Sequence, residues 1–459
     1  MSANNKKRYN ILATAVFLMA ALPSCKKFLE VSPVGSISTK TAYSNATNIE
    51  ASVNGIYYSL QQNGVIYNYS YNSVFPLLSD EAAIGNTTDL MQLQFASNNI
   101  TSDNSIAAGL WNNNYQTIYQ ANSLLANVPG VNGLDPVKKN QWLGEARFLR
   151  AYCYFILTRY FGKVPLATSP DYAVNNSLSR MDTTTVNQFI TTELEQAIKE
   201  LPDNYAAYSG SRTRVCKQTA RALLARHSLY QGSWDKAEAN ATLLINDPTF
   251  SMPNSLDDVV KANSPESIWE IAFSSSVQNQ TASMLVPVPN TSVKPAILPS
   301  SKLLQHFEAG DLRKGKYTAF AAIPAPGYDY INKFRDRITF TDQPKLFRLA
   351  EMYLIRAEAK VQQNKLDVTG DIDAVRSRAG LTGTLATTRT DLLAAIMQER
   401  FIELCFEGHR WLDLIRTGQA DAVLSAIKGN NWKSTDQLLP VPAVEIGNNP
   451  NLNPQNLGY

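Results

Sequence analysis

Apolar side chains recur every three to four positions over much of this chain, a spacing that predicts amphipathic helices. One stripe contains Ile49, Val53 and Ile56 and stops at Gly64. Glycine and proline end further stripes, because neither residue continues a helix well. A mainly α fold follows, with helices at about 48–63, 105–127, 138–161 and 184–201, the last capped by Thr184.

Two further stretches predict pairs of helices. The sequence TARALLARHSLYQGSWDKAEANATLLI contains two apolar stripes around Gly232. The spacing of Gly232, Trp234 and Ala237 is typical of the turn in a tetratricopeptide hairpin. A second pair is expected at Leu346–Lys360 and Ile372–Arg378. The pairs are neither adjacent nor evenly spaced, so a plain solenoid is not supported.

Other segments lack the helical period. Residues 65–104 contain many Asn, Ser and Tyr, residues 279–345 are rich in Pro, Gly and Ser, and we expect loops in both segments. Ser267–Ser274 alternates between apolar and polar residues, which predicts a strand. The proline-containing C-terminus is expected to run in a mostly extended form over the surface.

A row of three glutamates lies within the stretch 396–418. Like charges four residues apart on a helix repel one another, so Glu399, Glu403 and Glu407 require cations from elsewhere in the fold. Paired carboxylates can form an acid/base site. We interpret them instead as a structural ion network that locks helices together. The candidate partners are Arg348, Arg356, Arg400, Arg410 and Arg416.

Composition places the chain among large globular proteins. Of its 459 residues, 44% are hydrophobic and 18% are charged, which suits an extensive core. The formal net charge is +3, and Lys6, Lys7 and Arg8 account for the whole excess. A nearly neutral remainder gives no electrostatic case for nucleic acid as a partner.

The N-terminus has the pattern of an export signal. Lys6–Arg8 precede the apolar run Ile11–Leu22, which is too short to span a bilayer. The sequence Leu22-Pro23-Ser24-Cys25 resembles a bacterial lipoprotein box, which implies cleavage before Cys25 and attachment of lipid to its thiol. We therefore expect a signal peptide at 1–24 and a tether at 25–40. The alternative is an ordinary secreted protein.

No motif of established chemistry is evident. Cys153, Cys216 and Cys405 lie in helix-like apolar patterns, and we expect buried free thiols. The three histidines are not at metal-ligand spacing. A phosphate-binding loop, a dinucleotide fingerprint, a serine nucleophile elbow and a zinc-protease motif are all missing from the sequence. We expect no cofactor and no metal.

Several fragments together resemble one family. They include ASVNGIYYSL, LWNNNYQTIYQANSLL, GEARFLRAYCYFILTRYFGKVPL, RLAEMYLIRAEA, VRSRAGL and MQERFIELCFEGHRWLDLIRTG. Their order and spacing are similar to those of the SusD/RagB family of outer-membrane lipoproteins in Bacteroidetes. The resemblance covers nearly the whole mature chain. It implies one domain over 41–459, with an N-terminal part at about 41–250 and a C-terminal part at about 265–459.

The resemblance also implies an architecture and a role. The expected fold has tetratricopeptide-like helix pairs, a loop-rich ligand-binding face and a few short strands. Such proteins bind glycans, or in some cases peptides, and pass them to a SusC-like TonB-dependent transporter. Cys25 carries over as the lipid attachment site. Relatives have acidic residues after that cysteine, whereas Lys26 and Lys27 follow it here, which leaves the leaflet undecided.

Ligand-contacting residues cannot be transferred from the family and are chosen on physical grounds. Aromatic rings cover the C–H faces of sugars, and amides and carboxylates bind the hydroxyls. Tryptophans 111, 142, 234, 269 and 411 follow regular patterns and are assigned to the core. The alternative for the chosen aromatics is loop packing. The expected ligand residues are Tyr67, Tyr69, Tyr71, Phe95, Tyr328 and Tyr330.

Three classes of function remain in view. The first is a surface glycan-binding lipoprotein, with peptide capture as its close alternative. The second is a surface glycoside hydrolase, which requires two carboxyls roughly 5–10 Å apart in a cleft, one with a raised pKa. The third is a scaffold that holds only the transporter. The first agrees with the resemblance, and we take the protein to be a binding protein and not an enzyme.

Overall fold

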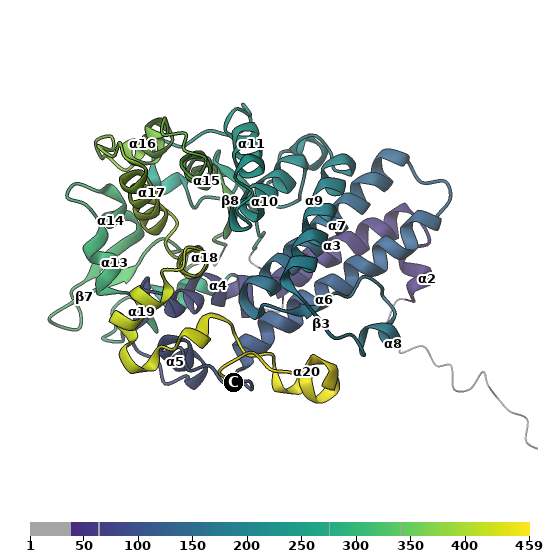
Figure 1. The fold of residues 1–459 in the computed structure, drawn as a ribbon, viewed down its shortest axis with the longest axis horizontal. Helices are drawn as coiled ribbons and strands as arrows, with labels where there is room; N and C mark the ends of the chain where they lie inside the picture. Colours follow the sequence, from purple (N-terminus) through teal and green to yellow (C-terminus); the bar gives the residue numbers. More distant parts are fainter. Residues whose placement is uncertain (1–37, 63–64, 275, 340) are drawn as a thin grey trace, which may run out of the picture.

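The computed structural model describes residues 38–459, apart from 63–64, 275 and 340. Within these residues the chain is mostly helical and contains four two-stranded antiparallel sheets (Figure 1). The predicted mainly α class, with few short strands, is therefore confirmed. None of the helices among the described residues has the length and apolar character needed to cross a bilayer.

The four helices predicted from the first stripes are present. They are α3 (Ala46–Gln62), α6 (Ser105–Asn127), α7 (Pro136–Phe161) and α9 (Thr183–Glu200). Helix α7 is almost wholly buried because it packs between α6 and α9. The expected cap of the last helix is wrong by two positions. Asp182 is the N-cap, and its carboxylate accepts from Thr185 N at 2.9 Å, as short acidic side chains commonly do.

Both predicted helix pairs are present. Helices α10 (Lys217–Tyr230) and α11 (Trp234–Ile245) form the first, and α15 (Leu349–Gln362) and α16 (Thr369–Arg378) form the second. Helix α11 packs on α15, so the pairs lie side by side. The second pair begins later than predicted, because Leu346 and Arg348 belong to strand β8 (Lys345–Arg348). Periodicity cannot distinguish a short buried apolar run in a strand from one in a helix.

Strand β8 pairs with β4 (Ser267–Glu270), which is shorter than the predicted strand at 267–274. The loops expected at 65–104 and 279–345 contain short elements. Each is too brief for a period to be visible in the sequence. They are η2 (Val65–Ser70), α4 (Tyr71–Ser73), η3 (Phe75–Leu78), β1 (Ala82–Ile84), α5 (Leu90–Ser97), α12 (Thr281–Leu285), β5 (Ile297–Pro299), α13 (Ser301–His306), α14 (Leu312–Tyr317), β6 (Thr318–Ala321) and β7 (Tyr328–Ile331).

The C-terminal part adds α17 (Arg389–Glu403), α18 (Arg410–Arg416), α19 (Ala420–Lys428) and α20 (Ala443–Asn448). The last segment runs back to the N-terminal helices, where Asn456 Nδ2 donates to Phe161 O at 3.0 Å. Strands β2 (Val164–Pro165) and β3 (Arg180–Met181) and the short helices α2 (Thr39–Ala42) and α8 (Tyr172–Asn175) lie at the same end of the molecule (Figure 1).

One cluster of buried apolar side chains extends from Ile49 to Leu452. It includes four of the five tryptophans assigned to the core, and Trp234 packs against it from a half-buried position. All three described cysteines are buried and free, which confirms the prediction of unpaired thiols.

Candidate functional site

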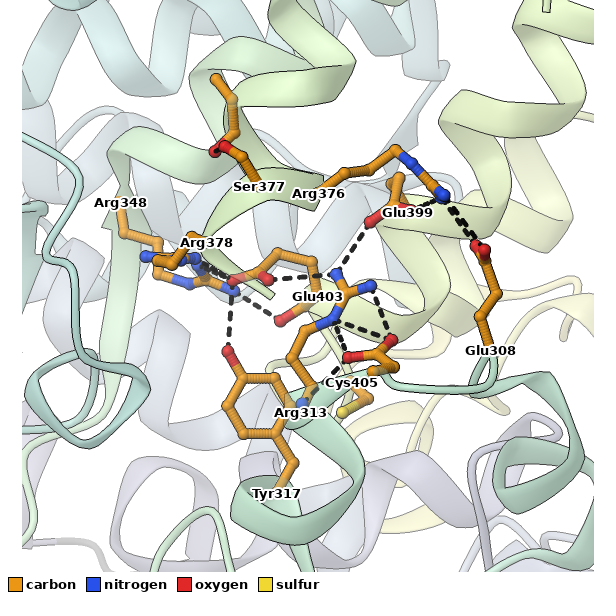
Figure 2. Close-up of polar contacts among 12 residues, drawn as sticks. Glu308, Arg313, Tyr317, Arg348, Arg376, Ser377, Arg378, Glu399, Glu403 and Cys405 are labelled. Atoms are coloured by element: carbon orange, nitrogen blue, oxygen red, sulfur yellow. Dashed lines mark hydrogen bonds and ion pairs between the residues drawn. The ribbon is translucent and has the colours of Figure 1, made fainter. Parts of the chain in front are cut away.

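The glutamate row lies where α17 ends. Glu399 and Glu403 project from the helix, and Glu407 follows in the turn before α18. The chain reverses there because Phe406 and Gly408 adopt positive φ angles of 63° and 77°. The three carboxylates therefore contact one group of cations from two directions. Glu399 and Glu403 are seen in Figure 2.

Arginines from three separate segments converge on Glu403 (Figure 2). Arg348 Nη1 lies 2.6 Å from Glu403 Oε1, and Arg378 Nη2 lies 2.5 Å from the same oxygen. Arg313 Nη1 donates to Glu399 at 2.8 Å and to Glu403 at 3.3 Å. Each guanidinium is buried, so these ion pairs join β8, α14 and α16 to the end of α17.

Among the five cations expected to meet the row, Arg348 is the one that does. It contacts Glu407 as well, with Nε 2.8 Å from Oε2. Sequence reasoning missed Arg313, Lys333, Arg376 and Arg378. Two of these lie in the fragment VRSRAGL, which was visible, whereas Arg313 and Lys333 lie in the segment expected to be loops. The other expected cations pair elsewhere: Arg356 with Asp371, Arg400 with Asp413, Arg410 with Asp80 and Arg416 with Glu358.

Burial and the arginines act on the three carboxyls in opposite directions. Burial raises the pKa of Glu403, but Arg378, Arg348 and Arg313 together outweigh it and hold the pKa well below its usual value. The pKa of Glu407 is lowered in the same way, against burial, by Arg348 and Lys333. Burial prevails at Glu399 and raises its pKa despite two arginine contacts. The three carboxylates of the row are therefore buried within an ion cluster.

Three of the residues expected to contact ligand are in the core, and that prediction is wrong for them. Tyr67 and Tyr71 are buried with their ring centroids 5.4 Å apart, and Tyr67 Oη donates to Tyr152 Oη at 2.8 Å. Phe95 is buried against Phe75 in an edge-to-face contact at 5.4 Å. A ring covered on both faces cannot stack on a sugar. The side chain of Tyr69 lies outside the described residues.

The burial of Tyr71 has a specific cause. A Cβ atom added at Gly408 would lie 2.5 Å from Tyr71 Cζ. The tyrosine ring therefore packs directly on the backbone of the turn between α17 and α18. Beside it, Asn72 Nδ2 donates to Phe406 O at 2.7 Å, and Phe406 N donates to Glu81 Oε1 at 3.0 Å.

An open surface does form from the expected loops. We define the loop face as strands β1 and β5, the β6–β7 hairpin and residues 286–296. Strand β1 pairs with β5, which contacts β7, so these segments are adjacent. The hairpin lies at the edge of the molecule (Figure 1). Exposed apolar side chains on this face are Val288, Val293, Phe320 and Ile323.

Phe320 is the most accessible aromatic ring on the loop face, with 63% of its surface exposed. Gly327 lies beneath it, since a Cβ there would be 2.3 Å from Phe320 Cζ. The glycine also has a φ of 94°, which side-chain-bearing residues rarely adopt. The backbone thus packs against the end of the ring, while most of the side chain stays exposed. Sequence reasoning missed Phe320 because a single phenylalanine in a short segment has no distinguishing pattern.

The two expected tyrosines of the hairpin differ from each other. Tyr328 is buried, and Lys294 Nζ lies 5.2 Å from its ring centroid, so the prediction of an open ring is wrong there. Tyr330 is half-buried and lies across the hairpin from Ala319. The carboxylate of Asp329 lies opposite Phe320 in the pairing register. Tyr330 therefore keeps its place among the candidate ligand residues.

A cavity of about 950 Å³ lies between α13, α17 and α19 and is lined by residues outside the loop face. Its walls combine alkyl side chains, including Leu393, Met397 and Val423, with polar and charged ones. The ring of Phe401 there is covered by the guanidinium of Arg410 at 4.0 Å. These walls offer a sugar no free aromatic face. Among the described residues, no group of His, Cys, Asp and Glu has the arrangement of a metal site.

Two family models match the chain. Residues 313–459 match the model described as the SusD family, and residues 27–229 match the model described as starch-binding associating with outer membrane. Together the two ranges cover more than half of the chain.

Some related proteins align with almost the whole of this chain. SusD-like protein P2 of Formosa agariphila is 25% identical over 99% of this chain and 100% of its own length. Starch-binding protein SusD of Bacteroides thetaiotaomicron is 39% identical over 127 residues, which are 26% of this chain and 22% of that protein.

Solved structures agree with the fold. A laminarin-binding SusD-like protein superimposes with a TM-score of 0.77 at 27% identity, covering 91% of this chain and all of that one. A SusD-like carbohydrate-binding protein of Bacteroides fragilis gives a TM-score of 0.80 at 22% identity, covering 90% and 100%. The two family models, the relatives along the whole chain and the shared fold together show that this protein belongs to the SusD family.

Proposed function

We propose that the protein is a cell-surface lipoprotein that binds a glycan and delivers it to a SusC-like TonB-dependent transporter of the outer membrane. The observation that carries the binding step is the exposed ring of Phe320, packed against Gly327, with Asp329 opposite it on the same side of the hairpin. An aromatic face beside hydroxyl-binding groups is the usual chemistry of sugar recognition. The names of a starch-binding relative and a laminarin-binding structure support a glycan as ligand.

Anchoring through Cys25 belongs to the same proposal. The cysteine and the signal peptide before it lie outside the described residues. Each buried methylene of an acyl chain adds about 0.8 kcal/mol to membrane binding, so several chains on Cys25 give a stable anchor. The family description that includes association with the outer membrane supports this location.

The hydrolase alternative requires a carboxyl that is free to transfer a proton within reach of a sugar. Glu399, Glu403 and Glu407 are instead buried and held by arginine or lysine. Their geometry supports a role in holding the fold together, and we propose binding without catalysis. A product assay on any bound glycan tests this part directly.

The binding step is tested with the full chain in detergent on an array of glycans and peptides. We expect glycan binding, and about a tenfold weaker affinity for Phe320→Ala and for Tyr330→Ala, since loss of one stacking contact costs about 1 kcal/mol or more. Tyr58→Ala is the matched control, because Tyr58 is 48% exposed on α3, outside the loop face. Binding of peptides alone, or of no ligand, contradicts the proposal.

The delivery step is tested separately by affinity purification from outer membranes. A tagged chain is expected to co-purify with a TonB-dependent barrel protein, and an untagged chain is the control. Recovery of the tagged protein without a barrel contradicts delivery and leaves the binding step to be judged by the array.

A further inference from the structure

A second pocket lies between α6, α8 and α20, with a volume of about 340 Å³. These helices are at the opposite end of the molecule from β7 and the loop face (Figure 1). Its walls combine aromatic rings with side-chain amides. The lining residues that matter here are Tyr115, Tyr119, Tyr172, Asn175, Glu445 and Asn448.

Two tyrosines at the pocket edge are unusually accessible. Tyr119 on α6 is 52% exposed, and Tyr172 at the start of α8 is 77% exposed. Inside the pocket, Tyr115 packs on Trp111 with ring centroids 4.9 Å apart. Free aromatic faces therefore lie above a floor that is also aromatic. Exposed rings of this size in a concave site are a typical feature of ligand binding.

Hydrogen bonds join the α6 and α8 walls of the pocket to β2 and to the segment that follows it. Tyr115 Oη donates to Pro165 O at 2.8 Å, and Asn122 Nδ2 donates to Ala167 O at 3.0 Å. Asn175 Nδ2 donates to Ser169 O at 2.7 Å. The pocket is thus preformed and does not depend on a ligand for its shape.

Polar groups in the pocket remain without partners. The Oδ1 atom of Asn175 is buried and accepts no hydrogen bond. The carboxyl of Glu445 is half-buried, and in the described part of the chain no cation and no hydrogen-bond donor pairs with it. Burial alone raises its pKa, since no cation opposes it. A polar group withdrawn from water without a partner costs free energy, which a hydroxyl-bearing ligand would recover.

We propose that this pocket is a second sugar-binding site, which takes one or two residues of a neutral glycan. The sugar faces stack on Tyr119 and Tyr172, and the hydroxyls donate to Glu445 and Asn175. Glu445 is the one charged side chain among the described lining residues, so an anionic sugar is repelled. This inference rests on the proposed function in taking the ligand to be a glycan and the loop face to be the first site.

A second site changes how a long glycan binds. A chain that reaches both the loop face and this pocket binds more tightly than either site alone allows, because the second contact is intramolecular. A short oligosaccharide occupies the two sites independently. The affinity should therefore rise with the length of the glycan more steeply for the wild-type protein than for a variant with only one site.

The test uses the full chain in detergent and isothermal titration calorimetry with laminarihexaose, maltohexaose and any neutral oligosaccharide found on the array. Wild type is expected to bind two short oligosaccharides per chain. The double variant with Tyr119→Ala and Tyr172→Ala is expected to bind one short oligosaccharide. Its affinity for a glycan long enough to reach both sites is expected to fall about tenfold. Tyr58→Ala is the control, with comparable exposure on another surface.

The outcomes separate this site from the proposed function. Binding that is weakened by Phe320→Ala but unchanged in stoichiometry and affinity by the tyrosine pair overturns the second site alone. Silence of the wild type on every glycan overturns the proposed function and this inference with it. As an independent readout, a wild-type crystal soaked in a bound oligosaccharide is expected to show a sugar ring on Tyr119 or Tyr172, and an empty pocket contradicts the proposal.

Discussion

At the scale of single residues, Glu403 has the most demanding environment in the ion cluster. Its carboxylate is fully buried and accepts hydrogen bonds from Arg313, Arg348 and Arg378. Tyr317 Oη donates to it as well, at 3.3 Å. One carboxylate thus contacts cations from three segments of the fold.

Replacing that charge tests how much the cluster contributes to stability. Glu403→Gln keeps the shape of the side chain but removes the one negative charge that Arg313, Arg348 and Arg378 share. The other acids of the cluster, Asp311, Glu399, Glu407 and Glu266, remain in contact with these guanidinium groups. We expect the free energy of unfolding to fall by about 3–5 kcal/mol, measured by urea denaturation. Glu195→Gln is the control, because Glu195 pairs with Lys236 on the surface, where such a change costs little. An unfolding midpoint equal to that of the wild type would show that Glu403 is solvated.

Glu81 makes the stability of the protein depend on pH, because its pKa is raised and not lowered as at Glu403. It is buried next to Asp80, and burial raises its pKa to about 8, against an ordinary value of 4.5. Between about pH 5 and pH 8 the unfolded chain loses this proton while the folded chain keeps it. The free energy of unfolding therefore falls as the pH rises through this window, by at most about 1.4 kcal/mol per pH unit.

We expect Glu81→Gln to flatten this decline, since glutamine resembles the protonated acid and keeps an acceptor for Phe406 N. Urea midpoints at pH 5, 6, 7 and 8 measure the effect, with Glu195→Gln as the control. Equal slopes in the wild type and Glu81→Gln would show that Glu81 is ionised in the folded protein.

The residue scale also shows what the sequence could reveal. The spacing of the glutamates was sufficient to require cations, because the repulsion between them is a local property. The identity of the cations was not, because Arg313 and Lys333 approach from segments without a periodic pattern. Likewise, alternating tyrosines suggested an exposed face at Tyr67 and Tyr71, but the chain is helical there, with Tyr67 in η2 and Tyr71 in α4, and both rings are buried in the core.

At the scale of elements, an ion pair joins α10 to α15. Arg226 binds Glu351 through two contacts of 2.6 Å, and its Nη2 donates to Leu346 O at 2.5 Å. The guanidinium lies 4.1 Å from the centroid of the Phe347 ring. The two helix pairs are therefore linked by one buried charge on each side.

A double-mutant cycle tests this link. Arg226→Met and Glu351→Leu are each expected to lower the free energy of unfolding by about 3–5 kcal/mol, because each leaves a buried charge without its partner. The double variant is expected to recover a large part of that loss, so that the coupling exceeds about 2 kcal/mol. Urea denaturation of the four chains measures it. Additive losses would mean that the two side chains act independently.

Long elements were predictable and short ones were not. Helices of 14 residues or more, such as α6, α7 and α10, repeat their apolar stripe often enough to be recognised. Strand β8 and helix α14, with 4 and 6 residues, are determined by what they pack against. The loop face is built from such short pieces, which explains why Phe320 was missed while the region that contains it was expected.

At the scale of the whole molecule, the proposed lipid anchor on Cys25 determines where the protein is located but not whether it folds. Cys25→Ala is expected to leave a folded chain that no longer sediments with membranes, because the thioether cannot form. Ultracentrifugation of cell lysates measures this, and Cys153→Ala is the control for loss of a thiol elsewhere. Unchanged membrane association of Cys25→Ala would contradict lipid anchoring.

The turn between α17 and α18 has a consequence for how the protein is made. Asn72 and Glu81 bond to Phe406, and Asp80 pairs with Arg410, across more than 300 positions of sequence. The N-terminal half of the chain is synthesised long before these partners. The side chains of Asn72, Asp80 and Glu81 therefore lack their native partners until synthesis is nearly complete. Contacts of such separation form slowly, and unfinished chains expose apolar surface. Truncated products should therefore be substrates for chaperones and proteases.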